Sequence, residues 1–137
     1  MARVLAIDPG TRRCGVAISD SARTMAFPRE ALSSDGVTAA VVRLVSDEGV
    51  DLVVVGRPVA LSGSETASTA VADELLMELR EGLGAVPVVA LDERLTTTEA
   101  QRSMRQAGVT SREHRGRLDS AAAVVMLQSY LESTTDE

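Results

Sequence analysis

The sequence predicts an α/β fold in which a mixed sheet of five strands is covered by helices on both faces. Two apolar segments near the N-terminus, residues 3–8 and 14–20, are only a few residues apart. That spacing suits an antiparallel hairpin and is too short for a helical crossover. Helix and strand patterns alternate afterwards, and the later strands are apolar on both faces, as in a parallel sheet. We therefore expect antiparallel pairing among the first three strands and parallel pairing after them.

The remaining elements follow from periodicity and from turn residues. Pro9-Gly10-Thr11 turns the chain after the first strand, and a weaker third strand over 24–29 contains Pro28, which predicts an edge position. Gly49 ends a helix that begins at residue 38. Val71, Leu75, Leu76 and Leu79 are expected to share the buried face of the next helix. The other predicted elements are strands over 51–56 and 86–91 and helices over 65–80, 96–108 and 119–131.

Length and composition restrict the class of protein. A chain of 137 residues, 45% of them hydrophobic, has enough apolar side chains for the core of one domain. One cysteine and one histidine exclude an internal disulfide and a Cys/His zinc site. No apolar run approaches the roughly 20 residues of a membrane span, and no signal-peptide pattern opens the chain. We expect a cytoplasmic protein without a membrane partner, with one domain over residues 1–132 and a loose tail over 133–137.

The overall charge argues against a general affinity for nucleic acid. The net charge is −6, with 20 acidic and 14 basic residues, and phosphate binding favours a basic surface. All 14 basic residues are arginine, which forms paired hydrogen bonds with phosphate oxygens. A genome-wide preference for arginine codons explains the same bias. Phe27 and Tyr130 are too few aromatic residues to stack single-stranded bases.

Acidic residues stand at three points where the chain leaves the predicted core. Asp8 ends the first strand, Asp92-Glu93 ends the last strand, and Asp119 opens the last helix. Ligands of open parallel sheets bind outside the carboxyl ends of the strands, so the first two segments are expected at one edge. If Asp119 joins them, the clustered carboxylates suit Mg²⁺ or Mn²⁺. Two such ions about 4 Å apart could hold the attacking and leaving oxygens of a phosphodiester.

Each acidic residue alone also has a purely structural explanation. Asp8 precedes Pro-Gly, as turn-forming aspartates do, and Asp119 is an ordinary helix N-cap. Asp92 and Glu93 with Arg94 could form a solvated charge pair. The coincidence of all three segments at element ends is what favours a metal site.

Two stretches of the sequence have a distinctive pattern: residues 4–17 (VLAIDPGTRRCGVA) and residues 92–100 (DERLTTTEA). The first resembles the opening of the YqgF/RuvX family, and the second resembles the most distinctive stretch of that family. Residues 118–123 (LDSAAA) resemble the start of its C-terminal helix. Residues 55–58 (VGRP) and 63–65 (GSE) fall where the family has Gly-x-Pro and a following glycine. One segment departs from the pattern, since Val-Ala-Leu-Ser-Gly at 59–63 replaces the common Leu-Asn-Met-Asp-Gly.

The resemblance implies an RNase H-like nuclease domain related to Holliday junction resolvases. It implies that Asp8, Glu93 and Asp119 are the catalytic, metal-binding acids. Glu93 is preferred because the resolvase-like pattern has a glutamate there, with Asp92 in reserve. The implied cofactor is Mg²⁺ or Mn²⁺, two ions with substrate, for hydrolysis by metal-activated water. The implied activity is maturation of the 5′ end of 16S ribosomal RNA, with resolvase-like action on branched DNA as a second substrate class.

Substrate binding is expected to depend on arginine. Residues 94–117 contain six arginines and two glutamates, a net charge of +4. A solvated face explains Arg102 and Arg105, whereas adjacency to the acids favours phosphate binding elsewhere. Ser64 is included because it opens a helix whose free N–H groups could hold a phosphate. The expected nucleic-acid-binding residues are Thr11, Arg12, Arg13, Ser64, Arg94, Arg112, Arg115 and Arg117.

Two other classes of protein remain open. The hairpin from Asp8 to Thr11 also resembles the phosphate-1 loop of actin-like ATPases, but that fold needs two such domains and is longer than 137 residues. An assembly factor could keep the fold without cleaving, although all three acids are present. The expected partners are structured or precursor rRNA, single-stranded or branched DNA and pre-ribosomal particles, bound by a monomer or a weak homodimer.

Overall fold

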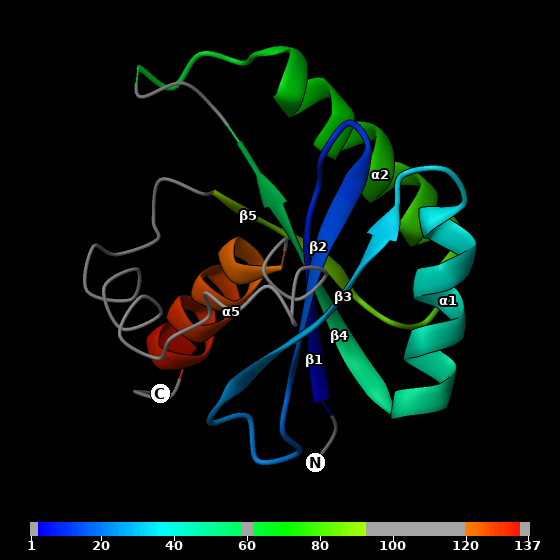
Figure 1. Cartoon of the computed structure of the whole chain (residues 1–137), viewed down its shortest axis with the longest axis vertical. Coiled ribbons are helices and arrows are strands. Elements are labelled where there is room, and N and C mark those ends of the chain that lie inside the picture. The colour runs from blue at the N-terminus through cyan, green and yellow to red at the C-terminus, as the bar shows by residue number, and fades with distance from the viewer. Residues whose placement is uncertain (1–2, 59–61, 93–119, 135–137) are drawn as a thin grey trace.

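The computed structural model describes residues 3–58, 62–92 and 120–134. They form a five-stranded sheet in the order β3-β2-β1-β4-β5, with helices on both faces (Figure 1). The β1–β2 and β2–β3 pairs are antiparallel, and the β1–β4 and β4–β5 pairs are parallel. The predicted fold class is confirmed. The elements are β1 (Arg3–Asp8), β2 (Arg13–Ser19), β3 (Ala26–Ser33), α1 (Val37–Glu48), β4 (Val50–Arg57), α2 (Ala67–Leu83), β5 (Val88–Asp92) and α5 (Ala121–Thr134).

The sheet separates two hydrophobic cores. Helices α1 and α2 cover one face, where Ile7 of β1 and Val55 of β4 are fully buried. Helix α5 covers the other face, above Ala6 of β1 and Val54 of β4 (Figure 1). Successive residues of a strand point to opposite faces, so the two central strands supply both cores. This explains why their sequences are almost uniformly apolar.

The last strand differs from its prediction because β5 lies at an edge of the sheet. Val88 is buried on the α2 face and Leu91 packs against the α5 core, but Ala90 is exposed. Burial on both faces is therefore confirmed for β4 and wrong for β5. The edge position of β3, predicted from Pro28, is confirmed.

The helix boundaries are set by capping groups. Helix α1 ends at Gly49, which has the left-handed φ of 66° that glycine adopts readily. Helix α2 begins two residues after its predicted start because the Thr66 hydroxyl accepts a hydrogen bond from the Thr69 N–H. Val71 is 37% exposed, so its predicted place on the buried face is wrong. The buried stripe of α2 consists of Thr69, Ala72, Leu75, Leu76 and Leu79.

Two elements are longer than predicted, and one predicted helix lies outside the described residues. Strand β3 continues to Ser33, four residues past its predicted end, because it pairs with β2 as far as Arg13. Helix α5 continues to Thr134 and so includes the first two residues of the predicted tail. The helix predicted over 96–108 lies outside the described residues. None of the described helices is long and apolar enough to cross a membrane.

Replacing Leu79 by alanine should lower the free energy of unfolding by about 2–5 kcal/mol, because it leaves a cavity between α2 and the sheet. Leu79 is 0% exposed. The matched control is Met77→Ala on the same helix, where the side chain is 62% exposed and the expected change is within about 0.5 kcal/mol. Urea unfolding measures both, and equal effects would contradict the described packing.

Candidate active site

The carboxyl ends of β1, β4 and β5 meet at one edge of the sheet. Ile7 pairs with Val55, and Val55 pairs with Ala90. Asp8 is therefore level with Leu91, two strands and about 10 Å away. Asp92 follows one residue further on. The predicted meeting of the first two acidic segments, Asp8 and Asp92-Glu93, at one edge agrees with this register for Asp8 and Asp92.

The two aspartates belong to opposite faces of the sheet. Asp8 is two residues after Ala6 on the same strand, so both side chains belong to the same face, and Ala6 lies in the α5 core. Asp92 follows the alternation of Val88, which packs on the α2 side. Asp92 also pairs in register with Arg57, whose guanidinium contacts α2. Asp8 and Asp92 thus do not share a face, and Asp92 is poorly placed to act beside Asp8.

The turn after Asp8 requires glycine. A Cβ atom on Gly10 would lie 2.3 Å from the carbonyl oxygen of Arg13, a clash with backbone that no side-chain movement relieves. Ser34 holds the same turn from the end of β3: its Oγ donates to the Gly10 carbonyl (2.9 Å) and its N–H donates to the Arg12 carbonyl (2.8 Å). The hairpin that carries Asp8 is therefore fixed at both its strands and its turn.

Three predicted substrate-binding residues lie on this turn. Thr11, Arg12 and Arg13 are all exposed. The two arginines line a shallow depression together with Glu30, Ala31 and Ser33 of β3. The depression holds two positive charges at the turn of the hairpin that carries Asp8, with one carboxylate, that of Glu30, opposing them. Ser64, by contrast, lies two residues before the N-cap of α2 and forms a hydrogen bond with Ser62 (Oγ to Oγ, 3.0 Å).

The start of α5 is anchored close to Asp8. The Val124 N–H donates to the Ser120 carbonyl (3.0 Å), so Ser120 occupies the N-cap position that the structural explanation assigned to Asp119. The Ser120 hydroxyl accepts a hydrogen bond from the Val16 N–H at 2.9 Å. Val16 pairs with Ile7, next to the pair of Asp8 with Gly15. Ser120, the residue after Asp119, is thus bonded to a residue of β2 whose partner on β1 directly precedes Asp8.

A separate ion-pair cluster occupies the α2 face of the same edge. Arg57 donates to both carboxylate oxygens of Asp73 (2.8 and 3.2 Å) and to Glu65 (3.0 Å). These hydrogen bonds from Arg57 hold the pKa of Asp73 below its ordinary value, and those from Asp73 and Glu65 raise the pKa of Arg57. Thr69 also donates from its hydroxyl to the Pro58 carbonyl. The cluster fixes the chain where it leaves β4, and no pattern in the sequence identified it.

Several predicted site residues lie outside the described residues. Within residues 3–58, 62–92 and 120–134, no three His, Cys, Asp or Glu side chains come together in a way that could hold a metal. The lone cysteine, Cys14, is 3% exposed and packs in the α1–α2 core, as a small apolar residue would. The predicted site residues beyond the description are Glu93, Arg94, Arg112, Arg115, Arg117 and Asp119.

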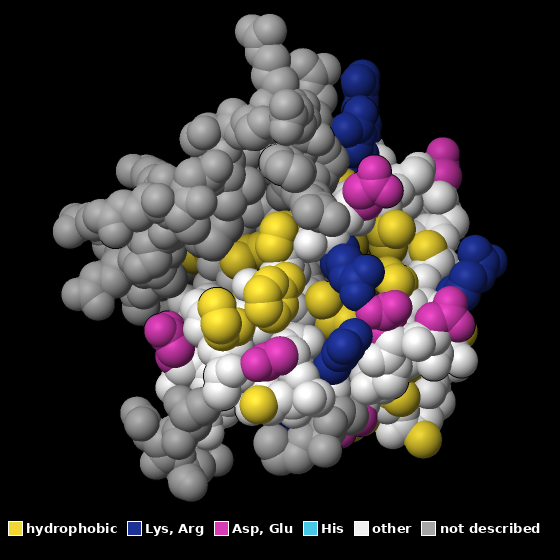
Figure 2. Space-filling model, turned by 60° about the horizontal axis from the view of Figure 1, so that its bottom comes forward, with side chains coloured by type: hydrophobic (Ala, Val, Ile, Leu, Met, Phe, Trp, Pro, Cys, Tyr) yellow, Lys and Arg dark blue, Asp and Glu magenta, His cyan; other side chains and the backbone are white. Residues whose placement is uncertain are grey.

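The described surface carries no continuous basic patch on the face drawn in Figure 2. Basic and acidic side chains alternate there beside exposed hydrophobic groups (Figure 2). Among the described residues, Glu48 pairs with Arg3 (3.1 Å) and with Arg29, so these charges compensate one another. The described part of the face in Figure 2 therefore lacks the charge pattern that binds phosphate.

The fold defines the class of protein first. The structure is similar to that of RuvC from T. thermophilus in complex with a Holliday junction substrate, with a TM-score of 0.67, 17% identity, and coverage of 99% of this chain and 97% of the other. A second RuvC structure from Thermus thermophilus gives a TM-score of 0.63. The fold is therefore RNase H-like.

The sequence then gives the family. The RuvX family, described as Holliday junction resolvase, matches residues 2–133, and the chain belongs to it. A relative from Mycobacteroides abscessus is 43% identical over 95% of this chain and 81% of its own length. Another from Chlorobaculum tepidum is 38% identical over 96% and 94%. Both carry the name "Putative pre-16S rRNA nuclease".

Replacing Asp73 by asparagine should lower the free energy of unfolding at neutral pH and have less effect in acid. Because the pKa of Asp73 is lowered by Arg57, its contribution is present above the ordinary value of 3.8. It is lost as the pH falls through the lowered value. Urea unfolding at several pH values between about 7 and 2 measures the difference between the two proteins. The control is the exposed neighbour Glu74→Gln, and a difference that does not shrink in acid would contradict the ion pair.

Proposed function

We propose that this chain is a metal-dependent nuclease of the RuvX family that cleaves a phosphodiester bond with the acids Asp8, Glu93 and Asp119. The observation that carries the proposal is the position of Asp8. Asp8 lies where the carboxyl ends of β1, β4 and β5 meet, on the face of the sheet that α5 covers. The start of α5 is bonded through Ser120 to Val16, whose partner Ile7 directly precedes Asp8. Ligand sites of parallel sheets lie at such an edge.

The donor chemistry at Asp8 fits a divalent cation. Asp8 is half-buried, and none of the described residues donates a hydrogen bond to its carboxylate. A partly buried carboxylate needs a compensating partner. Oxygen donors are the ligands that Mg²⁺ and Mn²⁺ prefer. Asp8 therefore has the position of a metal ligand, and no described residue donates to its carboxylate oxygens.

The alternation of side chains along β5 favours Glu93 over Asp92 as the metal-binding partner of Asp8. Asp92 belongs to the α2 face, beside Arg57, whereas Asp8 belongs to the α5 face. Successive residues of an extended chain face opposite sides, so the residue after Asp92 is the better candidate for the face of Asp8. This supports the choice that the family resemblance made.

In the proposed mechanism the acidic residues bind the divalent ions, and the residues of the turn after Asp8 orient the substrate. Bound divalent ions would lower the pKa of the attacking water and neutralise charge that develops on the phosphate. Asp8, Glu93 and Asp119 would hold those ions, because each lies at or near the end of a strand or helix of the domain. Arg12 and Arg13 would hold a neighbouring phosphate of the same strand, at the depression beside the hairpin.

The proposed substrate is the precursor of 16S ribosomal RNA, cleaved in the cytoplasm. The names of relatives at 38–43% identity support RNA, and the family description supports branched DNA as the second class. The comparison of an RNA fragment spanning the 5′ cleavage site with a four-way DNA junction decides between them. Binding to precursor RNA without cleavage, in Mg²⁺ and in Mn²⁺, would instead favour an assembly factor.

The variants Asp8→Asn and Glu93→Gln should each reduce the cleavage rate by at least about 100-fold, because each removes a charged ligand. The matched control is Asp92→Asn, which faces the other side of the sheet and should stay within about threefold of wild type. Single-turnover cleavage of precursor RNA in Mn²⁺ gives the rates. Loss of activity in Asp92→Asn with retention in Glu93→Gln would reverse the assignment.

The variant Arg12→Ala should weaken RNA binding and lower the slope of log affinity against log salt by about 1, the value expected for one lost phosphate contact. Arg43→Ala is the control, since Arg43 is exposed on α1, the helix on the opposite face from α5. Filter binding at several salt concentrations, in the presence of Ca²⁺ to prevent turnover, measures both. Equal slopes for Arg12→Ala and wild type would exclude the turn from the binding surface.

A further inference from the structure

Ser120 joins the backbones of two strands through its side chain. It is 0% exposed; its hydroxyl accepts from the Val16 N–H (2.9 Å) and donates to the Arg29 carbonyl (2.6 Å). Val16 and Arg29 are partners across the β2–β3 pair. The hydroxyl therefore stands between two groups that an uninterrupted ladder would pair directly.

The sheet is irregular at this point. From Cys14 to Val16 the chain advances two residues, while the partner on β3 moves three residues, from Leu32 to Arg29. The extra residue is a β-bulge, which interrupts the ladder and leaves room for a third group. The bulge and the buried hydroxyl are thus complementary features of elements about a hundred residues apart in the sequence.

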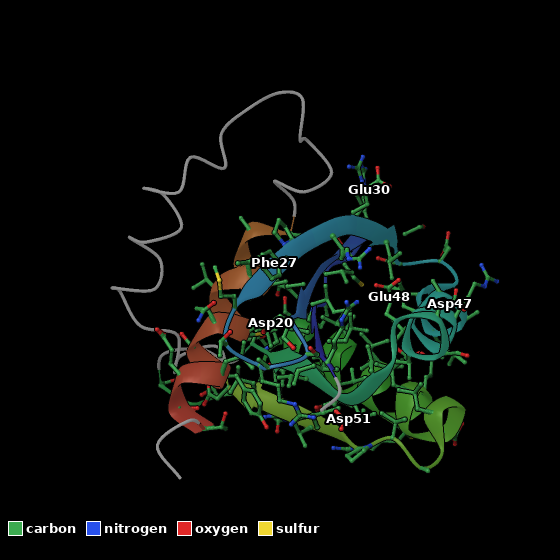
Figure 3. The ribbon with its side chains drawn as sticks, turned by 90° about the horizontal axis from the view of Figure 1, so that it is seen from below. Asp20, Phe27, Glu30, Asp47, Glu48 and Asp51 are labelled. Atoms are coloured by element: carbon green, nitrogen blue, oxygen red, sulfur yellow. The ribbon has the colours of Figure 1, made fainter. Side chains whose placement is uncertain are left out.

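A second side chain of α5 makes the same kind of contact further along β3. The Gln128 side chain accepts from the Ala26 N–H (3.0 Å) and donates to the Thr24 carbonyl (3.1 Å). Eight residues of helix span about 12 Å, and the strand from Arg29 to Ala26 spans about 10 Å. The spacings of the two contacts match, and α5 runs antiparallel to β3 between them. Figure 3 shows the helix beside that strand.

These polar contacts supply what the apolar packing of α5 cannot. The helix buries residues on most of its sides: Ala123, Val124, Val125, Met126, Leu127 and Leu131. Apolar burial is non-directional, so it specifies the position of such a helix less strictly than hydrogen bonds do. Hydrogen bonds have strict distances and angles, and Ser120 and Gln128 therefore fix the position of α5 on the sheet.

We propose that Ser120 is a positioning residue of the active site, which sets where the preceding residue, Asp119, enters the metal site. The inference rests on the proposed function. Consecutive Cα atoms are about 3.8 Å apart, so a displacement of Ser120 would carry the residue before it along. Ser120 is bonded to Val16, whose partner Ile7 precedes Asp8, and Asp8 is the one proposed ligand among the described residues. Mg²⁺ demands nearly octahedral geometry, so a small displacement of one carboxylate weakens binding.

The test measures binding of Mn²⁺ alone, from the electron paramagnetic resonance signal of the free ion. Ser120→Ala should raise the dissociation constant by about 10-fold or more, the range seen when groups that orient metal ligands are removed. It should also speed hydrogen exchange at the Val16 amide. Gln128→Ala removes the matched contact two turns further along α5. It should leave the Mn²⁺ dissociation constant within about twofold of wild type, while lowering the unfolding midpoint about as much as Ser120→Ala does.

The outcomes separate the inference from the proposed function. Wild-type affinity in Ser120→Ala, or an equal loss in Gln128→Ala, overturns the positioning role. Asp119→Asn is the reference: if it binds Mn²⁺ like wild type, or if wild type binds none, the proposed metal site itself is wrong. Loss in Asp119→Asn with none in Ser120→Ala leaves the metal site and removes only the role of Ser120. If Ser120→Ala does not fold, Ser120→Cys carries the same expectation with a weaker hydrogen-bonding group.

Discussion

Parallel pairing of three strands is the constraint on which the rest of the molecule depends. Because β1, β4 and β5 run in one direction, their carboxyl ends meet at a single edge. The antiparallel hairpin from β1 to β2 turns at that same edge, and α5 starts beside it through Ser120. Elements distant in the chain therefore contribute to one place. A chain with 20 acidic residues can concentrate function there while its average charge stays negative.

The sheet also divides that edge into two electrostatic environments. On the α2 face, Arg57 is hydrogen-bonded to Asp73 and Glu65, so its charge is already compensated. On the α5 face, none of the described residues neutralises Asp8. The first environment stabilises the chain where it leaves β4, and the second carries the carboxylate that we propose as a metal ligand. Under the proposed function, the α2 face serves structure and the α5 face serves chemistry.

Local patterns predicted much of the fold, and long-range contacts account for what they missed. The bounds of β1 and the end of α1 at Gly49 follow from apolar runs and turn residues, which act over a few positions. The edge position of β5 depends on the whole sheet and so left no local trace. The choice between Asp92 and Glu93 likewise needs the register of β5. Ser120 contacts strands that are about a hundred residues away in the sequence, so no local pattern predicted these contacts.

The proposed function requires that Asp8 shares a divalent metal site with acids on the α5 face of the sheet. Anomalous X-ray scattering from crystals of the whole chain grown with Mn²⁺ would locate the metal. We expect an anomalous peak within about 2.0–2.6 Å of an Asp8 carboxylate oxygen, with oxygens of Glu93 and Asp119 completing the ligand set. A peak on the α2 face beside Asp92, or full Mn²⁺ occupancy at a place remote from Asp8, would contradict the proposed function.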